Sequence, residues 1–168
     1  RMDIIKWINR ILSWEPNARI VLHGVSMGAA TVLMASGEDL PENVKAVIAD
    51  CGYTSEWDEF QREADTLHIP WFPVLNATSV LSKVRDGYDF KQASALAQVK
   101  KSRIPTLFIH GSSDELVPYS MLGELYGAAA CEKEELTVEG AGHALSSSVA
   151  PTLYWRTVED FIAKYLDR

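Results

Sequence analysis

Short apolar runs along the chain are separated by stretches in which apolar residues recur every three or four positions. The runs at 20–23, 44–49, 104–111 and 135–138 are bounded by turn residues, which favours buried strands. Strands that alternate with helical segments are typical of a parallel sheet covered by helices. The pattern therefore predicts an α/β fold with about four parallel strands.

Helical periodicity is clearest at the two ends of the chain. In the first segment, with Asp3 as a candidate N-cap, the apolar positions are Ile4, Trp7, Ile8, Ile11 and Leu12. The last helix opens at Pro151, and its predicted core stripe is Tyr154, Val158, Phe161, Ile162 and Tyr165. Between the strands, helices are expected at 29–35, with a stop at Gly37, and at about 93–99.

A helical insertion follows the second predicted strand. Residues 55–58, Ser-Glu-Trp-Asp, resemble a capping box and start a helix that runs to about Leu67. The segment 69–73 contains two prolines and interrupts the helix, and a further helix follows at about 74–84. The turn at 87–90 then brings the chain back.

The first strand ends in the sequence Gly24-Val-Ser-Met-Gly28, directly before an alanine-rich helix. A serine in the middle of Gly-x-Ser-x-Gly at a strand-to-helix turn is held on a strained backbone and presented as a nucleophile. The motif alone is loose, and an ordinary glycine-rich turn is the alternative. The strand and helix on either side favour Ser26 as a nucleophile.

A serine nucleophile needs a base and an orienting acid, and both follow later in the chain. Asp114 comes after the third predicted strand, and His143 lies in a glycine-flanked loop after the fourth. Asp50, at the end of the second strand, is the alternative acid. Two other histidines, His68 and His110, match no catalytic position.

The order Ser26, Asp114, His143 resembles that of the α/β-hydrolases. The matching motifs are 23–28, 110–118 and 140–143, and with the elements between them they span nearly the whole chain. The chain looks most like bacterial serine esterases and peptidases. The resemblance implies a Ser-His-Asp triad, an oxyanion-hole N–H from Met27, and no metal or organic cofactor.

In that family the insertion forms a lid or one wall of the acyl pocket, here at about 54–90. Trp57, Trp71 and Phe72 are therefore candidate substrate contacts, although core packing explains such aromatic residues equally well. The substrate is expected to be a small acyl compound. The sequence does not distinguish among carboxylesterase, thioesterase, lipase and peptidase activity.

The resembled fold has eight strands, whereas four are predicted here. We therefore expect residues 1–168 to form the carboxyl-terminal half of a hydrolase domain, with the amino-terminal half of the sheet absent. The strand before Ser26 would then have an unpaired apolar edge, which predicts pairing with a second copy or with the amino-terminal half. One of the N–H donors of the oxyanion hole would also be missing, and such a loss typically lowers turnover by about 10²- to 10³-fold.

Composition argues against several other classes of function. The net charge is −7 and basic residues are not clustered, which argues against nucleic acid as a partner. No apolar run reaches the roughly 18 residues of a membrane span. Cys51 and Cys131 lack the spacing of a metal site or a disulfide framework, and two free thiols favour the cytoplasm. Two other classes stay open, a non-catalytic hydrolase-like binding module and a self-associating fragment.

Overall fold

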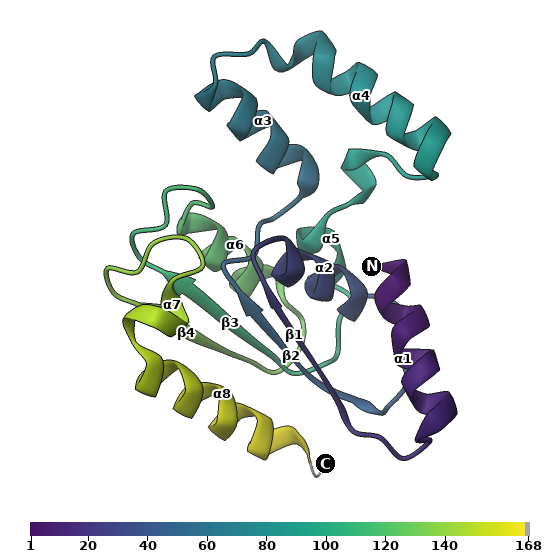
Figure 1. Ribbon diagram of the computed structural model, residues 1–168, viewed down its shortest axis with the longest axis vertical. Coiled ribbons are helices and arrows are strands. Elements are labelled where there is room, and N and C mark those ends of the chain that lie inside the picture. Colours follow the sequence, from purple (N-terminus) through teal and green to yellow (C-terminus); the bar gives the residue numbers. More distant parts are fainter. Residues whose placement is uncertain (167–168) are drawn as a thin grey trace.

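The computed structural model describes residues 1–166, and its centre is one sheet of four parallel strands (Figure 1). The strands are β1 (Ile20–Val25), β2 (Val44–Asp50), β3 (Thr106–Gly111) and β4 (Lys133–Val138). They lie side by side in the order of the sequence, and every neighbouring pair is parallel. The prediction of an α/β fold with four parallel strands is confirmed.

Helices cover both faces of this sheet. One apolar cluster joins the sheet to α1 (Met2–Trp14), α2 (Met27–Ser36), α5 (Ala95–Val99) and α6 (Ser120–Ala128). A second cluster, on the other face, packs β2 and β3 against α8 (Pro151–Leu166), which follows the short α7 (Ser146–Val149). Burial of apolar surface on both faces is the main stabilising contribution to such a fold.

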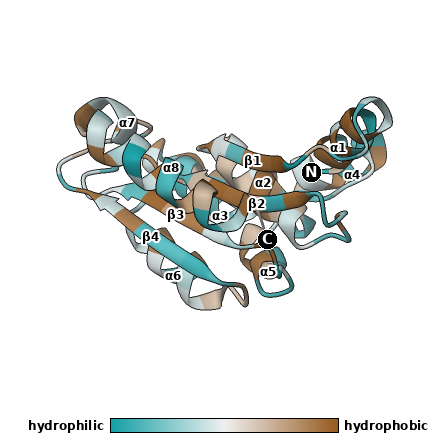
Figure 2. Ribbon diagram, turned by 90° about the horizontal axis from the view of Figure 1, so that it is seen from below, coloured by the Kyte–Doolittle hydropathy of each residue, from teal (hydrophilic) through white to brown (hydrophobic). Residues whose placement is uncertain are grey.

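The degree of burial explains why some elements are apolar throughout and others are not. β3 is buried at every position, and seven of the ten residues of α2 are buried. β4 lies at one end of the sheet, is buried only at Val138, and is correspondingly hydrophilic along most of its length (Figure 2). The core is therefore centred on β2, β3 and α2.

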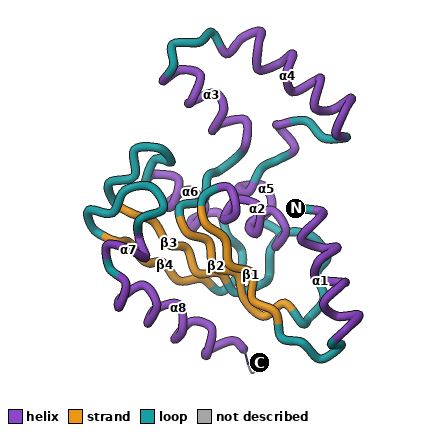
Figure 3. Tube along the Cα trace, viewed as in Figure 1, coloured by secondary structure: helices purple, strands orange, loops and turns teal. Residues whose placement is uncertain are grey.

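The predicted insertion forms an arm that stands away from the sheet (Figures 1 and 3). It consists of α3 (Glu56–Thr66), α4 (Trp71–Asp86) and the short 3₁₀ helix η1 (Phe90–Gln92), which pack against one another. At its base, an isolated antiparallel bridge joins Ser55 to Ser94. The arm therefore leaves the body and returns to it at the same place.

The start of α3 and a kink at Phe72 match the predicted signals, but α4 begins at Trp71, inside the segment predicted to interrupt the helix. Ser55 is the N-cap of α3, and its hydroxyl accepts the Asp58 N–H at 3.0 Å. The chain is non-helical at Phe72, within the predicted break, and α4 ends at Asp86, before Gly87 with its left-handed φ of 83°. Glycine adopts that conformation without the steric penalty of other residues.

Several predictions about single elements were wrong. Asp3 lies inside α1 and pairs with Lys6, so it does not cap the helix. Trp7 is 62% exposed and so does not belong to the buried face of α1. Within the predicted stripe, only Ile8 is completely buried. The sequence pattern also missed α6 and α7. Gly123 and Gly127 weaken the helical signal of α6, and α7 has only four residues.

Candidate active site

Ser26 occupies a strained turn between β1 and α2. Its φ of 55° and ψ of −119° are unusual for a residue other than glycine. The turn is tight because the backbone at Gly24 lies against that of Gly28, where a Cβ on Gly24 would collide with the Gly28 carbonyl. The result is that the Ser26 side chain projects from the end of the sheet.

His143 meets Ser26 from the loop after β4. The Ser26 hydroxyl lies 2.8 Å from Nε2 of His143, and Nδ1 of the same ring lies 2.9 Å from Oδ2 of Asp114. Because an ionised carboxylate only accepts, Nδ1 carries the hydrogen and Nε2 is free to accept the serine proton. The structure thus brings together the three residues that the sequence put forward as nucleophile, base and acid.

Asp114 is held by more donors than the sequence indicated. Its side chain is fully buried, and Oδ1 accepts the backbone N–H groups of Leu116 at 3.0 Å and Val117 at 2.9 Å. Nε2 of the buried His110 lies 3.2 Å from Oδ2 and 3.0 Å from the Val117 carbonyl. These contacts fix the carboxylate in place.

His110 was therefore undervalued from the sequence, which assigned it no role at this site. The structure places it against the acid that contacts His143. The signal that could have indicated the contact is its spacing, four residues before Asp114 at the end of a buried strand.

Asp50, the alternative acid, forms its hydrogen bond with a residue other than His143. Its carboxylate accepts the Ser146 hydroxyl at 3.1 Å. Burial raises the pKa of Asp50, and the hydroxyls of Ser146 and Tyr154 lower it in part. Asp114 is therefore the acid in contact with His143.

Cys51 lies beside the site but is a poor nucleophile. Burial and the nearby Asp50 charge raise the pKa of its thiol to about 12, so the thiol is neutral near pH 7. Its sulfur and the ligand atoms of Asp114 and His143 lie within 4.8 Å of one another, a spacing that a metal ion could bridge. Asp114 and His143 already bond to each other, however, and a thiol that holds its proton is a poor metal ligand.

The three aromatic residues proposed for substrate contact lie on the arm. Trp57 is half-buried, with the Lys91 ammonium 4.4 Å from its ring centre. Trp71 and Phe72 stack edge to face, with ring centres 6.3 Å apart, and Phe72 is 67% exposed. Binding of substrate by these residues stays a prediction.

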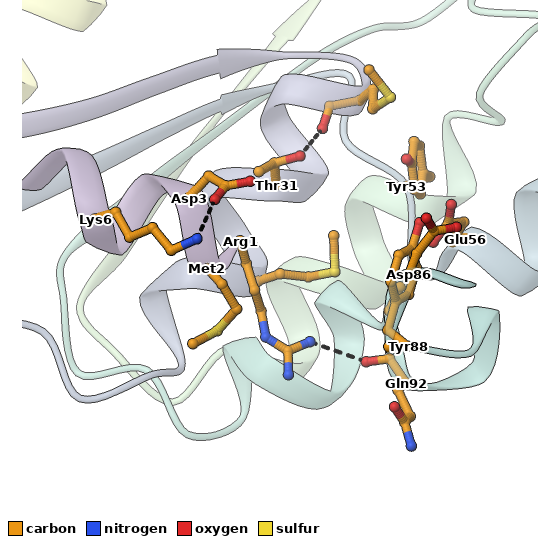
Figure 4. Close-up of a pocket in the computed structure, with 14 residues that line it drawn as sticks. Arg1, Met2, Asp3, Lys6, Thr31, Tyr53, Glu56, Asp86, Tyr88 and Gln92 are labelled. Atoms are coloured by element: carbon orange, nitrogen blue, oxygen red, sulfur yellow. Dashed lines mark hydrogen bonds and ion pairs between the residues drawn. The ribbon is translucent and has the colours of Figure 1, made fainter. Parts of the chain in front are cut away.

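A cavity of about 590 Å³ lies between the start of α1, the first turns of α2 and the base of the arm (Figure 4). Met27, the residue after Ser26, lines it together with Thr31, Met34 and Tyr53. The charged residues that line the cavity are Arg1, Asp3, Lys6, Glu56 and Asp86. The cavity thus adjoins the serine turn and combines apolar and charged walls.

A parallel sheet between layers of helices, with a strained serine turn at a strand end, defines the class of the chain as an α/β-hydrolase fold. Within that class, residues 2–168 match the prolyl oligopeptidase family, and the chain belongs to it.

The chain is also similar to longer proteins. The uncharacterized Bacillus subtilis protein YqkD is 32% identical over 165 residues, covering 95% of this chain and 53% of the relative. The alpha/beta hydrolase domain-containing protein WAV2 of Arabidopsis thaliana is 31% identical over 157 residues, covering 88% and 48%. The chain therefore spans about half the length of these relatives.

Two solved structures show the same fold at low identity. An esterase of Pyrococcus furiosus superposes with a TM-score of 0.72 at 19% identity, covering 98% of this chain and 61% of the esterase. An acylaminoacyl peptidase of Pyrococcus horikoshii gives a TM-score of 0.70 at 18% identity, covering 98% and 27%. Among the helices of residues 1–166, none has the length and apolar character needed to cross a membrane.

Proposed function

We propose that this chain carries the Ser-His-Asp triad of a hydrolase that cleaves carboxylic esters or related acyl substrates. The observation that carries the proposal is the unbroken path from the Ser26 hydroxyl through the His143 ring to the buried Asp114 carboxylate, at 2.8 and 2.9 Å. Membership of a hydrolase family and the likeness to an esterase and a peptidase support it.

In the proposed reaction, Ser26 Oγ attacks the acyl carbonyl carbon while Nε2 of His143 takes the serine proton. The Met27 N–H stabilises the negative charge that develops on the carbonyl oxygen. His143 then returns the proton to the leaving alcohol, and an acyl ester remains on Ser26. Water, deprotonated by the same histidine, attacks this ester, and the acid and free Ser26 are released.

Asp114 has an electrostatic and a geometric task in this scheme. It holds His143 with Nδ1 protonated, and its negative charge stabilises the imidazolium that forms in each half of the reaction. The hydrogen bonds from the Leu116 and Val117 N–H groups, and the close contact with His110, keep the carboxylate in one position throughout.

The cavity beside Met27 is the proposed binding place for part of the substrate. Met27, Met34 and Tyr53 offer it an apolar wall next to the serine turn. An acyl group of a few carbons would bury its surface against these three side chains.

Labelling with a fluorophosphonate probe tests the nucleophile. In the full-length natural protein, we expect Ser26→Ala to abolish labelling and to lower hydrolysis of p-nitrophenyl butyrate by about 10⁴-fold or more. Ser13→Ala is the control, since Ser13 is an exposed serine of α1. Equal labelling of the two variants would contradict the proposal.

A further inference from the structure

A second buried polar network lies next to the site. It is centred on Asp50, which is 1% exposed at the end of β2. Its carboxylate accepts the hydroxyl of Ser146 from α7 at 3.1 Å, and the nearby hydroxyl of Tyr154 from α8 lowers the pKa of the carboxyl group. The Tyr154 oxygen in turn lies 3.0 Å from Nε2 of His23 on β1.

The Ser146 hydroxyl is the donor in the bond to Asp50, because a carboxylate oxygen accepts it. His23 and Tyr154 form a separate hydrogen bond beside it. Polar groups of β1, α7 and α8 therefore gather at the end of β2.

Asp50 also holds the nucleophile through its main chain. The Ser26 N–H donates to the Asp50 carbonyl oxygen at 2.8 Å. One residue thus binds the turn that carries Ser26 with its backbone and the segment that follows His143 with its side chain. Ser146 lies three residues after His143 and is fully buried.

The loop around His143 needs such a restraint. Ala144, the next residue, has a φ of 57°, a left-handed conformation that costs free energy in residues other than glycine. A strained backbone persists only where surrounding contacts hold it. The bond from Ser146 to Asp50 is the first buried side-chain bond after the strained residue.

We propose that Asp50 is a positioning residue, which through Ser146 fixes the loop of His143 relative to Ser26. This inference rests on the proposed function, because it assigns His143 as the base. It also separates the tasks of two carboxylates, since Asp114 orients the ring of His143 and Asp50 holds the backbone that carries it. A displacement of about 1 Å at such a site can cost roughly 10²-fold in rate.

The test compares Ser146→Ala with Ser36→Ala in the full-length natural protein. Both serines are buried and donate one hydrogen bond, but Ser36 bonds to Leu33 at the far end of α2. For p-nitrophenyl butyrate hydrolysis, we expect Ser146→Ala to lower kcat by about 10- to 100-fold with KM changed less than about threefold. Ser36→Ala should keep kcat within about twofold.

Two variants of Asp50 give an independent readout. Asp50→Asn keeps an oxygen that can accept from Ser146, whereas Asp50→Ala removes it. We expect Asp50→Asn to retain at least about fivefold more kcat than Asp50→Ala, an order set by one hydrogen bond.

The inference is overturned if Ser146→Ala keeps the kcat of the unchanged protein and only lowers its melting temperature. The bond would then stabilise the fold without positioning His143. Failure of the proposed function looks different, because turnover would survive Ser26→Ala.

Discussion

Gly24 and Gly28 are the two glycines of the serine motif, yet the structure gives them different tasks. A Cβ at Gly24 would collide with the backbone of Gly28 and Ala29, whereas at Gly28 no atom outside its own helix lies within 4 Å. The close approach at Gly24 is what makes the turn tight enough to present Ser26. Gly28 is free of that constraint.

This difference predicts opposite effects of the same substitution. Gly24→Ala should lower the free energy of unfolding by about 1–3 kcal/mol, because the backbone has to move apart. Gly28→Ala should leave it unchanged or raise it by up to about 1 kcal/mol, because alanine favours the helix. Urea unfolding of both variants measures this, and an equal loss in both would contradict the steric explanation.

At the scale of elements, the arm is the part held least firmly to the rest. Its helices pack against one another, and its tip carries the exposed apolar residues Leu67 and Ile69. The N-cap bond from Ser55 to Asp58 lies at its base. Segments with few contacts to a core open locally at a lower free energy than the core itself.

Removal of that cap should therefore loosen the arm selectively. Ser55→Ala is expected to cost about 1 kcal/mol of helix stability, which makes proteolytic cleavage near 67–69 roughly fivefold faster. Limited proteolysis followed by mass spectrometry detects the site and rate. Ser148→Ala, an exposed serine in α7, should cleave at the original rate. Faster cleavage within the sheet instead of the arm would refute the expectation.

The sequence predicted elements well where burial made their pattern simple. β2 and β3 are apolar runs, and the stripe of α8 faces the core as expected. Prediction from the sequence failed where a feature depends on contacts between residues that are distant in sequence. The bond of Asp50 to Ser146 joins residues 96 positions apart, and no local pattern reveals it. The direction in which the arm projects is equally a tertiary property.

At the scale of the whole molecule, β1 is an edge strand of the sheet. Within residues 1–166 it pairs with β2 alone, and Val25 at its end is 42% exposed. An edge strand of this kind offers free N–H and C=O groups to another strand. We propose that this edge pairs with a second copy of the chain or with a further segment of the full-length protein.

The 168-residue chain, expressed alone, is therefore expected to self-associate. Size-exclusion chromatography with light scattering should give a mass of at least twice 18.7 kDa at micromolar concentration. The full-length natural protein is the control. A stable monomer of the chain at all concentrations would argue against an exposed pairing edge.

The closed base of the arm has a consequence for how this fold can change. The Glu56 N–H bonds to the Ala93 carbonyl at 2.9 Å and the Leu96 N–H to the Thr54 carbonyl at 2.9 Å, beside the Ser55–Ser94 bridge. The arm between these positions is therefore an insertion whose two ends lie next to each other. It can be exchanged for one of another length or shape while the sheet that carries Ser26, Asp114 and His143 stays the same, so new substrate preferences can arise without rebuilding the chemistry.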